Sequence, residues 1–584
     1  MERGRVKFLK FCLFAAVFVI VARLFYIQII KHDFYVAKAA DEHVYENKIE
    51  ATRGKIYMKD GDEIVPIVLN ETVYTVIFDP SIVNEEKSRE IFEKYAKDNL
   101  VAKWEDVFRD RGRRYYVVAR GIPYKEAKKI VEELSEKEVV GVVFEKTTKR
   151  VYPEGEMASG LLGFVNMEGN GQYGVEGALD EKLGGKDGSL KAVRDVNGVV
   201  LSIGNENIET PPVDGEDVVL SIDRNVQSRV EGILNNHVQN TAATNASAVV
   251  MNPRTGEVLA MANVPTYNPA KYAEVEDANL FRNNVVDEPY EAASVCKTFT
   301  FATAIDLGVM NAGTTFYNSG SMTIDDLTFQ NAYQGLYGTI TMQQALNYSL
   351  NTGSTTALIL ISGGGGITQS GREKLYEYYQ KFGLGRKTGI ELYESTGFVP
   401  SPNEYDWAMN FTYANTTFGQ GMNLTMIQIA SAFSGIVNDG IYHAPSVLAG
   451  KMVDGKFVKN EGVGKEERRV VSESTSTQMK EMLYGTRSNK RLYGIDKPGY
   501  YVGGKTGTGQ VVQDDGSYSE ATMAGETIAS YVGFGGAEGE LPEYVVMVKI
   551  WGEGQHLEGE KHAMPIFDDI SNYLIDYLKI RPKV

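Results

Sequence analysis

Residues 294–297 read Ser-Val-Cys-Lys and carry the strongest indication of what this chain does. They begin a stretch that is apolar at helical spacing up to Leu307, so Ser294 and Lys297 are expected to share one face of a helix. A serine hydroxyl is a poor nucleophile until a base removes its proton, and a lysine can act as that base only when its pKa is lowered. The pair is a candidate nucleophile and base, although Ser-x-x-Lys also arises by chance in a chain of 584 residues.

Two further motifs follow in the chain. Ser349-Leu350-Asn351 comes after a predicted helix over 341–348 and offers a hydroxyl and a carboxamide that can relay a proton and orient a substrate amide. Residues 505–508, Lys-Thr-Gly-Thr, follow a short β-like segment, where a cation can bind a carboxylate and backbone N–H groups can stabilise an oxyanion. In this order the three motifs match those of penicillin-binding proteins and serine β-lactamases. The predicted catalytic residues are Ser294, Lys297, Ser349, Asn351 and Lys505, and the predicted substrate and oxyanion residues are Thr506, Gly507 and Thr508.

Other chemistries find less support in the residues. Residues 499–506 also fit the phosphate-loop pattern Gly-x4-Gly-Lys-Thr, but Pro498 precedes them and residues 507–509, Gly-Thr-Gly, oppose the helix that such a loop opens. The six histidines form no His-Glu-x-x-His pair, and the chain has no Gly-x-Ser-x-Gly elbow. We therefore predict a lysine base with no metal and no cofactor. Cys296, between two residues of one helical face, is expected to point into the core rather than to react.

The bulk composition limits the partners and the architecture. A chain of 584 residues is too long for one ordinary core, so two or more domains are expected. A formal net charge of −17 makes nucleic acid an unsuitable partner. The two cysteines, Cys12 and Cys296, exclude a disulfide framework.

The N-terminal segment has the pattern of a membrane anchor. Residues 8–30 are apolar over a length that can cross a bilayer as a helix. Basic residues precede or begin this stretch, so the positive-inside rule predicts a cytoplasmic tail over 1–7 and places everything after Lys31 outside the cytoplasm. A cleaved signal peptide is the alternative, but the stretch is longer than a usual signal core and no small-x-small cleavage site follows.

The rest of the chain divides into two predicted domains. Residues 31–214 alternate short β-like runs, such as 72–78 and 115–119, with helical stretches such as 125–134, and contain no catalytic constellation. We interpret them as a pedestal or dimerisation-like domain that ends near Pro211-Pro212. Residues 215–584 form the predicted catalytic domain, with a strand over 217–222, a helix over 227–238 and a hairpin formed by 246–251 and 258–262. Strands on both sides of a helical interior indicate an α+β domain.

The sequence resembles the class B penicillin-binding proteins, which are monofunctional D,D-transpeptidases, from the anchor nearly to the C-terminus. The departures lie around the nucleophile: the family usually has Glu-Pro-Gly where this chain has Glu291-Ala292-Ala293, and Cys296 replaces a more usual Phe. Neither change removes a reacting group. The segments that carry the resemblance are 53–56, 150–153, 162–163 and 174–177 in the pedestal, and 382–385, 388–389, 418–421, Thr425 and 531–534 in the catalytic half.

The resemblance implies a fold and a reaction. The fold is a single transmembrane helix, an elongated mixed α/β pedestal, and a catalytic α+β domain whose antiparallel sheet is flanked by helices. The reaction is acylation of Ser294 by the D-Ala-D-Ala end of a peptidoglycan stem peptide, with Lys297 as base and the N–H groups of Ser294 and Thr508 around the oxyanion. Ser349, bridged to Lys505, would pass a proton to the leaving D-alanine. A neighbouring stem peptide then completes the cross-link, and β-lactams would acylate the same serine as inhibitors.

Several alternatives remain open within this reading. A D,D-carboxypeptidase or β-lactamase-type hydrolase uses the same motifs, and a β-lactam sensor or structural division scaffold would be acylated incidentally. Asn351 as the third residue of its motif and residues 114–120 favour septal over side-wall synthesis. By resemblance, the anchor and pedestal would hold a polytopic membrane glycosyltransferase and other division or elongation proteins. The catalytic domain would lie on the extracytoplasmic side of a bacterial cytoplasmic membrane.

Overall fold

The computed structural model divides the chain into two compact units. It describes residues 2–32, 34, 44–193, 208–403, 407–460, 467–489, 496–497, 499–510 and 525–582. One unit combines 1–54 with 184–215, and the other combines 55–183 with 216–584. The predicted domain bounds at 30/31 and 214/215 stay predictions, because this division follows contacts rather than sequence order.

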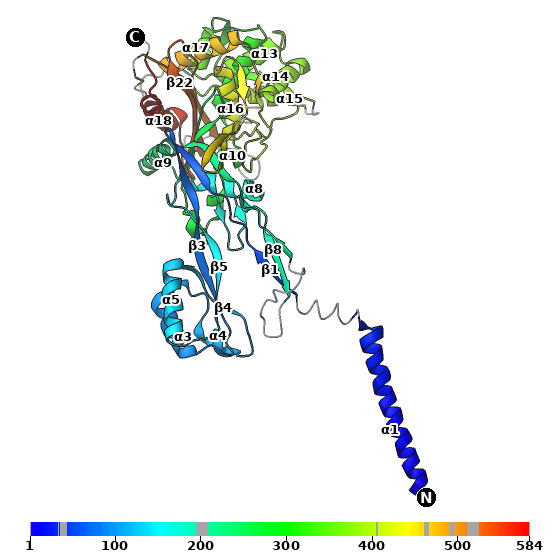
Figure 1. Cartoon of the computed structure of the whole chain (residues 1–584). Helices are drawn as coiled ribbons and strands as arrows, with labels where there is room; N and C mark the ends of the chain where they lie inside the picture. The colour runs from blue at the N-terminus through cyan, green and yellow to red at the C-terminus, as the bar shows by residue number, and fades with distance from the viewer. Residues whose placement is uncertain are drawn as a thin grey trace. The chain divides into compact units, whose positions relative to one another are not determined.

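The smaller unit contains an N-terminal helix and a three-stranded sheet (Figure 1). Helix α1 (Glu2–Phe25) continues into a π-helical turn (Tyr26–Ile30), and residues 4–30 are long and apolar enough to cross a membrane; the most apolar 18 residues have a mean hydropathy of 2.4. This confirms the predicted apolar helix. The sheet has the order β1-β8-β9 (Val44–Ile49, Gly188–Val193, Ile208–Thr210) and is antiparallel throughout.

A seven-stranded sheet runs through the larger unit. Its order is β19-β18-β10-β2-β3-β4, and β5 pairs with the C-terminal part of β3. Strand β10 lies parallel to β2, with Val218 opposite Ile56, so the sheet combines strands from both sides of the predicted boundary at 214/215. The strands are β2 (Ile56–Asp60), β3 (Glu63–Phe78), β4 (Tyr116–Pro123), β5 (Val142–Val151), β10 (Asp217–Asp223), β18 (Leu448–Val453) and β19 (Lys456–Lys459).

Three helices cover one end of β3, β4 and β5 (Figure 1). Helices α3 (Glu85–Tyr95), α4 (Trp104–Arg109) and α5 (Tyr124–Glu136) enclose a small apolar core with these strands. Phe78 and Phe92 are fully buried there and meet edge to face, with ring centroids 5.2 Å apart. The predicted strands at 72–78 and 115–119 and the predicted helix at 125–134 are confirmed.

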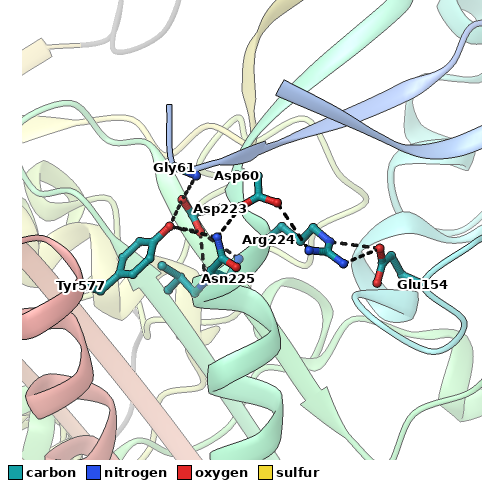
Figure 2. A network of polar contacts seen from close by, with 8 residues as sticks. Asp60, Gly61, Glu154, Asp223, Arg224, Asn225 and Tyr577 are labelled. Atoms are coloured by element: carbon teal, nitrogen blue, oxygen red, sulfur yellow. Dashed lines mark hydrogen bonds and ion pairs between the residues drawn. The ribbon is translucent and has the colours of Figure 1, made fainter. Parts of the chain in front are cut away.

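A polar network fastens the β2–β3 turn to the catalytic half of the unit (Figure 2). Asp223 caps α9 (Arg224–Gln239), accepts a hydrogen bond from the Tyr577 hydroxyl at 2.9 Å, and accepts another from the Gly61 N–H at 3.2 Å. Arg224 donates to Glu154, in the loop after β5, at 2.7 Å. Segments distant in sequence are therefore held together by side chains that are only partly exposed.

A five-stranded antiparallel sheet forms the centre of the catalytic half, in the order β12-β11-β23-β22-β21. Alternate residues of a strand face opposite sides of the sheet. Ala248 and Val250 pack with α9 and α18 (Met564–Tyr577), whereas Val249 and Met251 join the hydrophobic core on the other face, which contains residues within 295–305. Strand β21 is an edge of this sheet. The strands are β11 (Asn245–Met251), β12 (Val258–Val264), β21 (Tyr500–Gln510), β22 (Thr527–Ala537) and β23 (Tyr544–Trp551).

The helices and short hairpins between β12 and β21 complete an α+β domain with helices on both faces of its sheet, as predicted. Helix α16 is buried along its whole length and packs on β11 and β23. The longer helices are α11 (Lys297–Asp306), α13 (Asn351–Ile361), α14 (Gln369–Phe382), α15 (Met409–Thr416), α16 (Met426–Val437) and α17 (Glu473–Asn489). The shorter ones are α10 (Asn284–Asp287) and α12 (Met342–Asn347). The short strands of this segment are β13 (Thr315–Asn318), β14 (Ser321–Ile324), β15 (Leu327–Gln330), β16 (Gly338–Thr341), β17 (Ile441–His443) and β20 (Glu467–Arg469). Earlier in the larger unit, after β5, lie α6 (Ser159–Leu162), α7 (Gly174–Ala178), α8 (Asp180–Gly184) and the hairpin strands β6 (Phe164–Val165) and β7 (Gly171–Gln172).

Candidate active site

Ser294 lies in a 3-10 turn (Ala293–Cys296) that leads directly into α11. Its side chain is half-buried, whereas Lys297, the first residue of the helix, is completely buried. Cys296 is also fully buried, as predicted, and burial raises the pKa of its thiol. A buried thiol with a raised pKa is a poor nucleophile, so the half-buried Ser294 is the accessible candidate nucleophile of this turn.

The backbone immediately before the nucleophile is held in an uncommon conformation. Ala293 has φ of 49°, in the left-handed region, and its N–H donates to the Gly419 carbonyl at 3.2 Å. A Cβ at Gly419 would lie 2.2 Å from the Ala293 carbonyl oxygen, so the segment 418–421 must have glycine there to support the turn. The glycine that the family usually has before the serine adopts such a positive φ easily, whereas the alanine of this chain adopts it only with backbone strain.

Ala293→Gly is expected to leave the protein about 1–2 kcal/mol more stable than the neighbouring variant Ala292→Gly. Left-handed φ costs an L-residue about this much, and glycine at position 293 removes the cost. Ala292 has φ of −74°, so glycine there relieves no strain, while the chain entropy that glycine adds to the unfolded state is the same in both variants and cancels. Urea unfolding of the full-length variants in detergent measures the difference. Equal stabilities would show that the turn is not strained.

Lys297 joins the second motif to the first. Its ammonium nitrogen donates to the Ser349 carbonyl oxygen, to Ser349 Oγ at 3.2 Å and to Asn351 Oδ1 at 2.9 Å. Burial, and secondly the positive charge of Lys505, hold the pKa of Lys297 well below its usual value. An amine with such a pKa has a larger neutral fraction near neutral pH, which a general base requires.

Lys505 approaches the same serine from the edge strand β21. Its side chain is 1% exposed, and Nζ donates to Ser349 Oγ at 2.9 Å and to the Thr506 carbonyl oxygen at 3.0 Å. Ser349 therefore lies between two amines, and its own φ of 55° is unusual for a serine. Strained backbone of this kind persists where the surroundings fix it, often at functional sites.

A buried amide network that the sequence did not reveal orients Asn351. Asn351 Nδ2 donates to the Gln330 carbonyl at 2.9 Å, which turns Oδ1 toward Lys297. The next residue along the hairpin, Asn331, is 2% exposed, accepts from the Thr352 N–H at 3.0 Å and donates to Asn318 Oδ1 at 3.0 Å. Asparagines in a loop carry no periodic signal, so only the folded chain identifies this support.

The third motif also packs close to the nucleophile turn. A Cβ at Gly507 would lie 2.6 Å from the Ala292 carbonyl oxygen, so this glycine allows β21 to approach the segment that carries Ser294. Thr508 is exposed on the other side of the strand, and its Oγ1 accepts from the Gly559 N–H at 3.0 Å. Residues 500–510 form a strand rather than a loop and a helix, which excludes the phosphate-loop alternative.

The structure thus brings most of the predicted site residues together. Lys297, Ser349, Asn351, Lys505 and the carbonyl of Thr506 form one hydrogen-bonded network, and Gly507 lies against the turn that carries Ser294. The Ser294 hydroxyl has no hydrogen-bond partner among the residues that the structure describes. The Thr508 hydroxyl is not part of this network and accepts a hydrogen bond from the Gly559 N–H.

Comparison with known families agrees with this geometry. The family model of the penicillin-binding protein transpeptidase domain matches residues 246–572, more than half of the chain. The chain belongs to the penicillin-binding proteins. The model of the penicillin-binding protein dimerisation domain matches residues 48–220. A dimerisation domain followed by a transpeptidase domain is the class B arrangement, which confirms the resemblance seen in the sequence.

Similar proteins cover nearly the whole of this penicillin-binding protein. Stage V sporulation protein D of Bacillus subtilis is 30% identical over 580 residues, which cover 97% of this chain and 85% of the relative. Peptidoglycan D,D-transpeptidase FtsI of Escherichia coli is 26% identical over 592 residues, covering 98% and 91%. The crystal structure of a peptidoglycan synthetase from Bifidobacterium adolescentis has a TM-score of 0.71 at 21% identity and covers 93% of this chain and 98% of that one, which shows a shared fold.

Proposed function

We propose that this penicillin-binding protein is a serine D,D-transpeptidase that cross-links peptidoglycan stem peptides, in septal wall synthesis rather than in side-wall elongation. The observation that carries the proposal is the completely buried Lys297, three residues after Ser294 and joined through Ser349 to Lys505. The names of the relatives, one a D,D-transpeptidase and one a sporulation protein, support the reaction class and a septum-like role.

In the first step Ser294 becomes acylated. The neutral Lys297 amine accepts the hydroxyl proton as Oγ attacks the carbonyl of the penultimate D-alanine. The backbone N–H groups of Ser294 and Thr508 stabilise the oxyanion that forms. Collapse of this intermediate breaks the bond to the terminal D-alanine and leaves an ester on Ser294.

Ser349 supplies the path for the proton to the leaving amine. Lys505 donates to Ser349 Oγ at 2.9 Å, so the Ser349 O–H is free to turn toward Lys297, whose nitrogen lies 3.2 Å away, or toward the leaving nitrogen. The proton taken by Lys297 passes through Ser349 to D-alanine, and Lys297 is neutral again. The charge retained on Lys505 is available for the substrate carboxylate.

In the second step the amine of a neighbouring stem peptide attacks the ester. Lys297 accepts a proton from that amine as the new amide forms and returns it to Ser294 Oγ, so Ser294 leaves as the hydroxyl and Lys297 is neutral again. As a neutral amine, Lys297 can donate its two hydrogens to the Ser349 carbonyl oxygen and to Asn351 Oδ1 and keep its lone pair for the proton that it accepts. No group outside the chain and its two substrates is required by this proton balance.

The apolar N-terminal helix supports a location of this chemistry on the side of the membrane where wall is made. Residues 4–30 form the candidate span, and the basic residues before it favour a cytoplasmic N-terminus, so the catalytic domain lies outside the cytoplasm. The polytopic glycosyltransferase and the other division proteins expected by resemblance would bind the anchor and pedestal. Reaction of a cysteine placed at Tyr115, an exposed pedestal residue, with a membrane-impermeant thiol reagent in intact cells tests the orientation.

Product analysis tests the reaction itself. The full-length protein in nanodiscs is given a synthetic pentapeptide ending in D-Ala-D-Ala together with an amine acceptor, and the products are separated by mass. Release of one D-alanine for each new amide is expected. Accumulation of the hydrolysed tetrapeptide alone would indicate a carboxypeptidase or β-lactamase-type hydrolase. Acylation by penicillin without any peptide turnover would indicate a sensor or scaffold.

A further inference from the structure

A cavity lies away from the catalytic motifs, on the face of the five-stranded sheet that carries Ser247 and Lys549. It has a volume of about 430 Å³ and is bounded by the ends of β11, β12 and β23, a 3-10 turn (Ala278–Phe281) and α10. This volume falls within the roughly 300–1,000 Å³ of small-ligand sites. None of its lining residues takes part in the proposed acyl transfer.

The floor of the cavity holds a buried cation that the mechanism does not use. Lys549 is 6% exposed, its ammonium pairs with the Glu288 carboxylate, and it lies 5.0 Å from the centroid of the Tyr290 ring. Burial lowers the pKa of Lys549. The other cation of the lining, Arg282, donates to the Asp287 carboxylate at 2.8 Å. Both positive charges are thus already neutralised, so an anionic ligand would gain little here.

The walls offer amides and one indole instead. Asn245 and Trp551 form a cross-strand pair, next to the pair of Ser247 and Lys549, so these four side chains line one face of the sheet. Opposite them the side-chain amides of Asn279 and Asn284 have no hydrogen-bond partner among the described residues. An amide presents two donors and an acceptor, and an indole presents a flat apolar face with one N–H.

This combination suits one class of ligand. A sugar ring has hydroxyl groups around its edge and apolar C–H groups on its face, and an acetamido group matches the hydrogen-bonding pattern of a facing carboxamide. A charged ligand could also form hydrogen bonds with these amides, but its charge would find no unpaired opposite charge in the lining, because Lys549 and Arg282 are already paired with carboxylates. We propose that the cavity binds an uncharged N-acetylated sugar of the glycan strand.

The cavity is close enough to the reacting serine for one glycan strand to bind in the cavity while its stem peptide reaches Ser294. Lys549 is paired with Ser530 and Ser530 with Gly507, so two strand spacings, about 10 Å, separate Lys549 from the catalytic strand. The four residues of an extended stem peptide up to the attacked carbonyl span roughly 13–14 Å. The stem peptide that reaches Ser294 is therefore long enough to belong to a sugar bound in the cavity. That the sugar belongs to a peptidoglycan glycan strand rests on the proposed function, whereas sugar binding by the cavity does not.

Tryptophan fluorescence provides a direct test. The chain has three tryptophans, and Trp104→Phe with Trp407→Phe leaves Trp551 as the only one. Titration of this full-length protein with N,N′-diacetylchitobiose is expected to give a saturable change, with half-saturation at least about tenfold below that of maltose. Adding Asn279→Ala and Asn284→Ala should raise the half-saturation concentration at least about fivefold, as expected for lost hydrogen bonds. Asn235→Ala, on the exposed side of α9, is the matched control and should change nothing.

Two further measurements keep the outcomes distinct. Saturation-transfer NMR on the unmodified chain should show contact with the acetamido methyl groups, which does not depend on how the tryptophan variants fold. Penicillin labelling of the same samples reports Ser294 separately: lost labelling with retained sugar binding would contradict the proposed function and leave the cavity assignment standing. A response to sodium phosphate but not to the disaccharide, or equal affinity for maltose, would overturn the assignment.

Discussion

A Ser294→Ala protein is expected to take up no covalent label from a fluorescent penicillin. Ser294 is the half-buried hydroxyl of the turn that enters α11, and the neighbouring Cys296 is completely buried with a raised pKa. Removing Oγ removes the only atom in this turn that can form the ester. The measurement is in-gel fluorescence of the full-length protein in detergent after incubation for several half-times of the wild-type reaction.

A matched serine variant separates chemistry from folding. Ser81→Ala changes an exposed pedestal hydroxyl far along the chain from the site and should label at the wild-type rate. The thermal unfolding midpoint of Ser294→Ala should stay close to that of the wild type. A label that persisted on Ser294→Ala would contradict the assignment, and peptide mapping would then show whether Ser349 carries it.

Lys297→Met is expected to slow acylation by about 10²–10⁴-fold, the usual contribution of a positioned general base. Methionine has nearly the same length as lysine and fills the completely buried space without a charge, so the loss reports on the base rather than on a cavity. Ser349 and Asn351 then lose their shared donor. The second-order rate constant with the fluorescent penicillin, taken from stopped time points, measures the effect.

The pH dependence distinguishes a base from a structural cation. Burial and Lys505 lower the pKa of Lys297, so the neutral base is present at a lower pH than an ordinary lysine would allow. The wild-type rate should therefore rise with pH and level off above the lowered pKa, and this rise should be missing in Lys297→Met. Lys451→Met, an exposed lysine that pairs with Glu216 at 3.4 Å, is the control and should keep the wild-type profile. An unchanged rate in Lys297→Met would rule out the lysine as base.

The sequence predicted those parts of the site that depend on local spacing. Helical spacing predicted only that Ser294 and Lys297 share one face, and their catalytic roles, with that of Lys505, were predicted from the order of the three motifs. Local spacing also predicted α9 and the β11–β12 hairpin, whose patterns of alternation and turn residues are strong. The burial of Cys296 followed from its place between two residues of one helical face.

The rest depends on contacts between segments distant in the chain. The support of Asn351 by Gln330, and of the following helix by Asn331, joins residues about twenty positions apart through single hydrogen bonds that leave no pattern in the sequence. The positive φ of Ala293 is likewise invisible until Gly419 is placed against it. Parallel pairing of β10 with β2 could not be read from either strand, because each is locally an ordinary β-run.

That parallel pairing has a consequence for how the chain folds during synthesis. The Lys55 backbone N–H donates to Asp217 Oδ1 at 2.7 Å across 162 positions. During synthesis one edge of the β2–β3 hairpin therefore stays unpaired until β10 has been made. At translation rates of 5–20 residues per second the wait lasts roughly 8–30 s. Throughout that interval the hairpin has an open edge that another chain could join. The slow closure of this long-range contact makes the newly synthesised chain most prone to aggregation before the catalytic half has emerged.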